Sequence, residues 1–183
     1  MEGLLVNVKT PPILREFLIS RNNGSDILKV DCNDVFARKI LCLLEPTPFD
    51  CKIQTSNESD IKVEISFFKC GNTMVWPEHK SYLSEQSQNS LVYDWNKTFK
   101  EIFFNYVIAF CKGMNFKIPC QKKAIMSFCI DYNIPWNDIT YDTMEKSWKR
   151  SHLRKKYKLN FKRARFEFYR EKVQIVLSPI IKN

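Results

Sequence analysis

Large apolar side chains recur at three- and four-residue intervals between residues 92 and 110, and this periodicity constrains the fold more than any other feature of the chain. Polar residues such as Lys97 and Asn105 lie elsewhere on the helical cylinder, and Gly113 stands where a helix-ending glycine would. A face this wide and aromatic is typical of a core helix. The sequence therefore predicts a long helix near 90–112 as the spine of the core. Its apolar face consists of Val92, Trp95, Phe99, Ile102, Phe103, Tyr106, Val107 and Phe110.

The beginning of the chain predicts small elements of mixed type. Thr10 is placed to cap a short helix whose first turn contains Pro12. Residues 26–30 suit a short strand. A further helix is expected to begin at Asn33 and to stop before Pro46.

Between residues 61 and 67 apolar and polar side chains alternate, which is the pattern of a half-buried strand. Residues 51–55 are its expected partner, giving a small antiparallel β-hairpin near 51–68. Together with the core helix near 90–112, this predicts an α+β fold that is mainly helical.

The composition indicates a folded chain, since 44% of the residues are hydrophobic and 14% are aromatic. The first residues lack the basic region of a secretory signal. The longest strongly apolar run, 102–111, is about half of the ~20 residues needed to cross a bilayer. We therefore expect a soluble, cytoplasmic protein with no membrane partner.

The cysteines and histidines give no metal-binding pattern. The seven cysteines include no Cys-x-x-Cys pair, which favours reduced thiols over a disulfide framework or a zinc site. Cys111, Cys120 and Cys129 recur at nine-residue intervals, but Cys129 belongs to an apolar stripe and is more simply a core residue. The histidines, His79 and His152, are far apart, and the glycines are too scattered for a phosphate-binding loop. We expect no metal and no cofactor.

Most of the net charge is concentrated in one stretch. Residues 140–172 contain 12 Lys or Arg and 4 Asp or Glu, while the whole chain has a net charge of +9. Aromatic residues such as Trp148, Tyr157 and Phe161 are interleaved with these cations. Cations can neutralise phosphates and aromatic rings can stack on bases, so the stretch favours nucleic acid as a partner. An acidic protein, a membrane surface and simple solvation are the alternatives.

A pattern that resembles a helix-turn-helix leads into the basic stretch. Residues 122–132 carry a helical apolar stripe, Pro135 interrupts the helix, and Asp138 or Thr140 can cap the next one. The end of the chain fits either another helix or a hairpin at 163–178, which would make a winged-helix module.

The domain organisation follows this change in charge. We expect a neutral α+β part with the core helix at 1–118 and a basic, helical, nucleic-acid-binding part at 119–183; the alternative is one compact domain. The predicted nucleic-acid-binding residues are Thr140, Lys146, Lys149, Arg150, Arg154, Lys155, Lys156, Arg163 and Arg165.

The hypothesis that the chain is an enzyme depends on Asp50, Asp60 and Lys62. These residues loosely resemble the pattern of restriction-type nucleases, in which one carboxylate is followed by a carboxylate-x-Lys group. There the acids hold Mg²⁺ and the lysine steadies the attacked phosphate. The same alternation also describes an ordinary solvent-exposed strand face. We therefore predict a protein without catalytic residues, with a Mg-dependent nuclease as a remote alternative.

The chain also carries a resemblance over its C-terminal half. It is formed by Tyr82-Leu83-Ser84-Glu85, the aromatic helix around 99–110, Lys123-Ala124-Ile125 with Phe128, and Ile139-Thr140-Tyr141-Asp142 with Lys146 and Arg150. This order resembles small uncharacterised proteins from phages and mobile elements of Bacteroidota, which implies a DNA-binding role on a mobile element.

The sequence thus predicts a non-enzymatic nucleic-acid-binding protein, DNA being the expected partner, that uses a basic C-terminal helix. The alternative is a structural or interaction protein, such as a phage component or a host-factor inhibitor, whose basic face binds an acidic protein. Self-association into a homo-oligomer is compatible with both.

Overall fold

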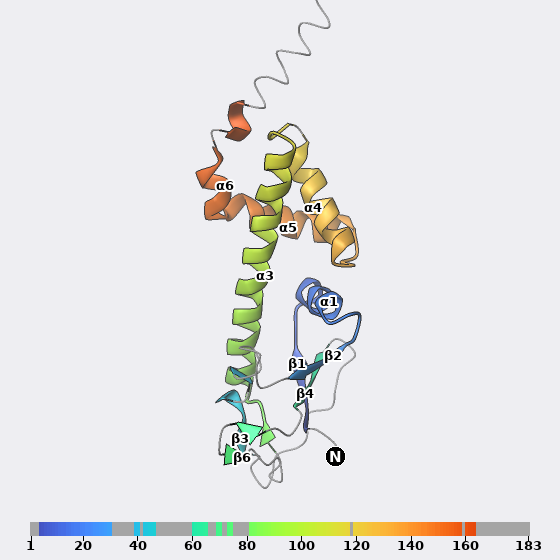
Figure 1. Cartoon of the computed structure of the whole chain (residues 1–183), viewed down its shortest axis with the longest axis vertical. Coiled ribbons are helices and arrows are strands. Elements are labelled where there is room, and N and C mark those ends of the chain that lie inside the picture. Colours follow the sequence, from blue (N-terminus) through green and yellow to red (C-terminus); the bar gives the residue numbers. More distant parts are fainter. Residues whose placement is uncertain are drawn as a thin grey trace, which may run out of the picture. The chain divides into compact units, whose positions relative to one another are not determined.

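The computed structural model of the chain describes residues 4–30, 39–40, 42–46, 60–65, 69–70, 73–74, 81–117, 119–158 and 160–163. Helices predominate and a small three-stranded sheet accompanies them, which confirms the predicted α+β, mainly helical class (Figure 1). The chain forms two compact units, residues 1–99 and 100–183. The division between them falls inside the long helix. The charge distribution predicted a domain boundary at 118/119, and that domain boundary stays a prediction.

The described part of the first unit combines short strands with helical segments and the beginning of the long helix. Its helical residues are those of α1 (Pro12–Arg21), residues 39–40 and 42–43, and the first half of α3 (Glu85–Gly113). Its strands are β1 (Leu4–Lys9), β2 (Ile27–Val30), β3 (Glu45–Pro46), β4 (Asp60–Ile65), β5 (Lys69–Cys70), β6 (Thr73–Met74) and β7 (Ser81–Tyr82). The two-residue strands pair as β3 with β7 and β5 with β6.

The main sheet has the order β1-β4-β2, with β4 antiparallel to β1 and parallel to β2. Val6 and Val8 on β1 and Ile61 and Val63 on β4 are buried on one face. On the other face, Lys62 lies 3.7 Å from Asp26. The period-2 pattern around residues 61–65 thus predicted this strand correctly, because a half-buried strand must alternate.

The predicted hairpin partner of β4 was wrong. Both edges of β4 are hydrogen-bonded, one by β1 and the other by β2, so residues 51–55 have no free edge along 62–65. Those residues lie outside the described part of the chain. The missed partner, β1, carries its own alternation of Val6 and Val8 with Asn7 and Lys9.

The core of the first unit joins α1 to the beginning of α3. Phe17 of α1 contacts Phe99 of α3, with ring centroids 5.0 Å apart at 72°. Leu91 and Trp95 continue the buried side of α3 toward its start. One detail of α1 corrects the prediction: Pro11 stands at the N-cap position, and Thr10 is buried before it without making a side-chain cap hydrogen bond. Pro12 fills the first helical position, where a missing N–H costs nothing.

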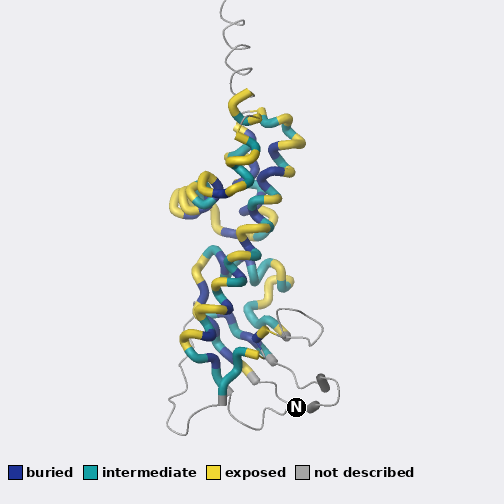
Figure 2. The backbone as a smooth tube through the Cα atoms, turned by 90° about the vertical axis from the view of Figure 1, so that its left-hand side faces the viewer, coloured by how far each residue is buried: buried dark blue, intermediate teal, exposed yellow. Residues whose placement is uncertain are grey.

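In the described residues of the second unit, the regular elements are all helices. This unit contains the second half of α3, then α4 (Cys120–Asp131), α5 (Asp138–Arg150) and α6 (His152–Lys156), and residues 160–163 are also helical. Buried and exposed residues alternate along α3, α4 and α5, as expected for helices packed on one side, whereas α6 has no buried residue (Figure 2). None of the helices in the described ranges is both long and apolar enough to cross a membrane.

Aromatic contacts hold the core of this unit together. Phe128 of α4 contacts Phe103 and Tyr106 of α3, with ring centroids 5.0 and 5.2 Å apart. Trp148 of α5 is fully buried and lies 6.0 Å from Phe104. α4 therefore contacts Phe103 and Tyr106 of the predicted apolar face, whereas α5 contacts Phe104, which the predicted face did not include.

The helix ends differ in detail from the prediction. α3 closes through a hydrogen bond from the N–H of Phe116 to the carbonyl of Cys111, 2.7 Å long, and Asn115 and Phe116 take positive φ values of 49° and 57°. Gly113, predicted to terminate this helix, is still helical. The left-handed turn thus comes after the glycine, and a bulky Phe116 occupies a conformation that such residues rarely adopt.

Candidate nucleic-acid interface

The predicted site starts on α5, which follows α4 after a turn at 132–137. Asn137 caps the helix: its Oδ1 accepts the N–H of Thr140 at 2.8 Å. The predicted caps, Asp138 and Thr140, therefore lie inside the first turn. Asp138 is still favourable there, because a negative charge stabilises a helix N-terminus.

Thr140 does not belong to an accessible surface. Its side chain is buried at 7% exposure, since it lies on the same side of α5 as Met144 and Trp148. This corrects its inclusion among the predicted nucleic-acid-binding residues. A residue four positions before a core methionine shares its helix face, and this spacing could have excluded it.

Two of the predicted cations on α5 already have acidic partners. Lys146 lies 3.8 Å from Asp142, and Lys149 donates a hydrogen bond of 2.8 Å to Glu145. Both are i,i+4 pairs on a solvated helix face, where each contributes a few tenths of a kcal/mol. Arg150, in contrast, is exposed at the end of α5 and has no ion-pair partner in the described part of the chain.

The charge distribution on α5 bears on the helix-turn-helix hypothesis. A recognition helix contacts base edges with its N-terminal residues. Here the exposed residues of that half include Asp138, Asp142 and Ile139, which is 80% exposed. Carboxylates would be repelled by phosphates, so the basic C-terminal end of α5 is better placed to meet a polyanion.

The remaining predicted cations follow α5. Ser151 caps α6 by accepting the N–H of Arg154 at 3.1 Å. Lys155 and Lys156 are exposed on this short helix, and Arg163 is exposed in the helical stretch 160–163. Arg165 and the predicted hairpin at 163–178, apart from its first residue, lie outside the described residues.

The structure identifies a second basic segment that the predicted nucleic-acid-binding site did not include. Residues 112–123, named here the turn segment, contain four Lys and no acid, and they include the end of α3 and the start of α4. Residues 149–163, named the arm segment, contain eight Lys or Arg and no acid. The signal that could have revealed the turn segment is the long acid-free interval between Glu101 and Asp131.

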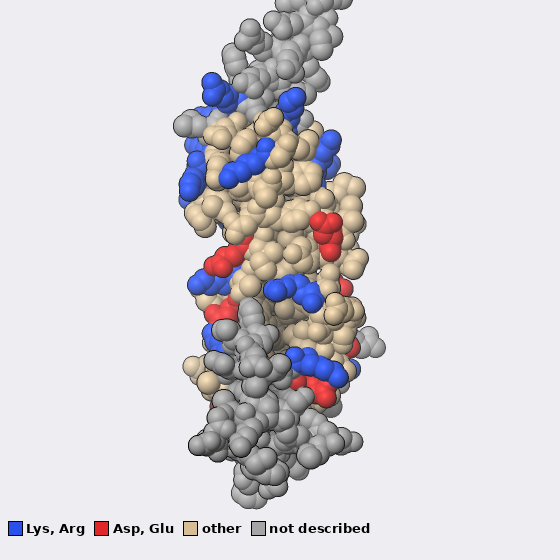
Figure 3. Space-filling model, in the orientation of Figure 1, with Lys and Arg blue, Asp and Glu red and all other residues tan. Residues whose placement is uncertain are grey.

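Aromatic rings join the two segments. Phe116 of the turn segment stacks on Tyr157 of the arm segment, with centroids 6.0 Å apart, and meets Phe161 edge-on at 5.0 Å. The Lys112 ammonium lies 5.2 Å from the centre of the Tyr157 ring. On the face shown in Figure 3, Lys and Arg side chains surround the end of this unit that carries the α3–α4 turn, and no described acidic side chain is visible there.

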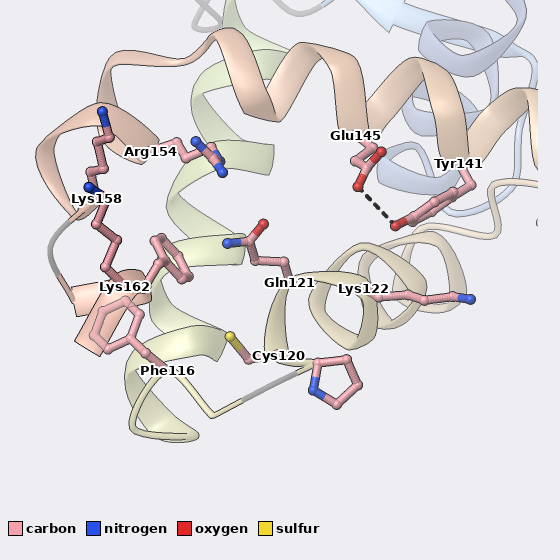
Figure 4. A pocket seen from close by; sticks show the side chains of 11 residues that line it. Phe116, Cys120, Gln121, Lys122, Tyr141, Glu145, Arg154, Lys158 and Lys162 are labelled. Atoms are coloured by element: carbon pink, nitrogen blue, oxygen red, sulfur yellow. Dashed lines mark hydrogen bonds between the residues drawn. The ribbon is translucent and has the colours of Figure 1, made fainter. Parts of the chain in front are cut away.

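A pocket of about 520 Å³ lies where the two segments meet α5 (Figure 4). The turn segment and α4 supply aromatic, thiol and amide groups, α5 supplies a hydroxyl and a carboxylate, and the arm segment supplies cations and a ring. The lining residues are Phe116, Pro119, Cys120, Gln121, Lys122, Tyr141, Glu145, Arg154, Lys158, Phe161 and Lys162.

The polar groups of the pocket include cations that make no ion pair in the described part of the chain. Glu145 accepts the Tyr141 hydroxyl at 3.2 Å through one oxygen and the Lys149 ammonium at 2.8 Å through the other. The Lys149 hydrogen bond lowers the pKa of Glu145, while burial and then the Glu145 charge raise the pKa of Tyr141. Arg154 makes no ion pair within the described ranges, and its Nε is buried without a hydrogen-bond partner. Figure 4 shows its guanidinium and the Gln121 amide pointing toward one another.

Cys120 lines the pocket, and its thiol interacts with that of Cys111. The interaction with Cys120 raises the pKa of Cys111, and the same interaction lowers the pKa of Cys120. Both side chains are buried. Within the described ranges, no three His, Cys, Asp or Glu side chains lie together in a way that could hold a metal ion.

The residues of the nuclease alternative lie in the first unit. Lys62 on β4 faces Asp26 at 3.7 Å, and Glu64 on the same strand lies 3.7 Å from Lys29. Asp60 begins β4, and Asp50 lies outside the described residues. The polar face of the strand is thus occupied by cross-strand ion pairs.

Comparison of the chain with protein-family models, with curated proteins and with solved structures found no match.

Proposed function

We propose that this protein binds nucleic acid, without catalysing a reaction on it, through the joined surface of the turn segment and the arm segment. DNA is the first partner to test. The N-terminal α+β unit would accompany this surface as a separate structural part.

The observation that supports the proposal is the convergence of two acid-free basic segments. The turn segment has four cations and the arm segment has eight. The contacts of Phe116 with Tyr157 and Phe161 hold the segments beside one another. A concentrated positive surface attracts phosphates because binding releases their condensed counterions, and this contribution does not depend on base sequence.

The test is a fluorescence-anisotropy titration of a short labelled DNA at salt concentrations from about 50 to 200 mM. If about six cations contact phosphates of duplex DNA, the slope of log K against log salt is about −5. In the double variant Arg150→Gln, Lys156→Gln, two exposed cations are removed from the arm segment. Each lost phosphate contact makes the slope of log K against log salt shallower by about 0.9. We therefore expect the DNA affinity of this variant to fall at least tenfold.

The matched control is the double variant Lys9→Gln, Lys97→Gln, which removes the same charge from exposed positions of the first unit. It should keep most of the wild-type affinity. Equal losses in the two double variants would show that only net charge matters and would count against the proposed surface. A wild-type protein that binds no DNA at the lowest salt, and that purifies with an acidic protein instead of nucleic acid, would favour the interaction-protein alternative.

A further inference from the structure

We infer that the pocket between the turn segment and the arm segment binds one unstacked nucleotide, its base together with its phosphate. This inference rests on the proposed function and deepens it, since it predicts a preference for single-stranded over fully paired nucleic acid. A free nucleotide offers the same chemistry, and the experiment separates the two sources.

Arg154 is the residue of the pocket that we expect to bind an anion. Its Nε is buried and has no hydrogen-bond partner. Its charge helps to lower the pKa of Glu145, but both oxygens of that carboxylate already accept hydrogen bonds, from Tyr141 and from Lys149. A guanidinium presents its donors in a planar fork that matches two phosphate oxygens. A phosphate in the pocket would therefore satisfy a group that the protein leaves without a partner.

The sequence around Arg154 supplies further positive charge. Lys158 and Lys162 follow on the arm segment and line the same pocket. In the described part of the chain neither lysine has an acidic partner. Among the described residues that line the pocket, Glu145 has the only carboxylate, and two donors occupy it. The net charge of the wall is thus positive, as an anion site requires.

The aromatic walls fit a base better than they fit a bare phosphate. Phe116 and Phe161 both line the pocket and contact each other edge-on. Stacking of a base on an aromatic side chain contributes about 1–3 kcal/mol and tolerates any base, because every base has a π-face. A base paired inside a duplex cannot reach such a wall, whereas an unpaired base can.

Gln121 completes the set of groups that a base needs. Its half-buried amide offers both donors and an acceptor toward the pocket, facing Arg154 (Figure 4). The pocket volume of about 520 Å³ lies within the range of small-ligand pockets, about 300–1,000 Å³. The same cavity therefore presents a cation for phosphate, rings for stacking and an amide for a base edge.

The experiment compares three probes on the full chain: a labelled single-stranded DNA, the fully paired duplex of the same sequence, and the free nucleoside monophosphate as competitor. For Arg154→Gln we expect the single-strand affinity to fall at least tenfold and the ratio of single-strand to duplex affinity to fall with it. Arg150→Gln, an equal change of charge outside the pocket, should weaken both DNA forms by similar factors and leave the ratio unchanged. Circular dichroism of each variant checks that it is folded.

A second variant keeps the test valid if Arg154→Gln does not fold. Gln121→Glu places a negative charge beside Arg154 and should also reduce the affinity ratio. Asn105→Asp makes the same amide-to-carboxylate change at an exposed position of α3 that does not line the pocket. This control should not reduce the ratio of single-strand to duplex affinity.

The outcomes separate this inference from the proposed function. DNA binding with an unchanged ratio in both pocket variants overturns the nucleotide site and leaves the basic surface intact. Direct binding of the free nucleotide, measured by isothermal titration calorimetry and lost in the pocket variants, together with no binding of either DNA form, overturns the proposed function and identifies a free nucleotide as the ligand. Reduced ratios in both pocket variants but not in their controls support an unpaired nucleotide of a strand.

Discussion

Cys129 is only 1% exposed, and burial alone raises the pKa of its thiol to about 11. Its Sγ lies 3.5 Å from the sulfur of Met144, so the thiol packs in an apolar contact between α4 and α5. The charged thiolate loses its hydration there, and the folded state therefore favours the protonated form. The apolar stripe of α4 correctly predicted this cysteine as a core residue.

This shift makes stability depend on pH in one direction. Because the pKa is higher in the folded state, the stabilisation is complete below the unfolded value near 9 and is lost as pH rises through about 11. Over that window the thiol should reduce the free energy of unfolding by about 2–3 kcal/mol. Urea unfolding of wild type and of Cys129→Ala at a series of pH values measures it.

In that comparison, the groups that titrate in both proteins cancel. The difference in the free energy of unfolding between wild type and Cys129→Ala should be constant up to pH about 9 and should shrink above it. A constant difference up to pH about 11 would mean that the folded protein does not hold the thiol protonated.

At the scale of the elements, the turn between α4 and α5 depends on two asparagines. Asn133 takes a left-handed φ of 50°, and the N–H of Ile134 closes α4 by donating to the carbonyl of Cys129 at 2.8 Å. Asn137 then starts α5 by accepting the N–H of Thr140. Ile134, between them, is buried at 4% exposure and anchors the turn to the core.

Replacing the cap of α5 should destabilise the second unit. In Asn137→Ala the N–H of Thr140 loses its acceptor, and we expect the free energy of unfolding to fall by about 1 kcal/mol. Asn137→Asp keeps an acceptor and adds a charge that the helix N-terminus favours, so it should remain at wild-type stability or above. Chemical denaturation of the two variants checks this; equal losses in both would show that the side-chain hydrogen bond does not stabilise α5.

The elements also show why some helix signals were easier to interpret than others. The long stripe of α3 repeats over many turns, so the helix could be predicted from it. Its end could not be placed at the right residue, because a glycine permits a helix end without requiring it. The cap of α5 was predicted at Asp138 or Thr140, one or three residues after the observed cap Asn137, since each of these residue types is a good N-cap.

At the scale of the whole molecule, the proposed surface combines segments that are separated in the sequence. The arm segment contains the predicted cations except Lys146 and Arg165. The turn segment adds Lys112, Lys117, Lys122 and Lys123, none of which was among the predicted nucleic-acid-binding residues. If both segments form one surface, removing cations from the turn segment must weaken nucleic-acid binding.

The double variant Lys117→Gln, Lys123→Gln tests this, since both lysines are exposed. For single-stranded DNA the slope of log K against log salt should become shallower by about 1.4, or by about 1.8 for duplex DNA. The variant Lys9→Gln, Lys97→Gln, with the same loss of charge in the first unit, should leave the slope unchanged. An unchanged slope in the turn-segment variant would restrict the surface to the arm segment.

The sequence by itself determined the fold class, the core face of α3, the β4 strand and the helices on either side of the 132–137 turn. All of these depend on local periodicity, which a helix or strand must show when it buries one side. Only the tertiary structure decided that β1 and β2 flank β4, that Thr140 is buried, and that Arg154 faces a pocket. It also brought the turn segment beside the arm segment through Phe116. Those facts depend on which faces meet across long stretches of chain, and neither residue spacing nor charge counts contain that information.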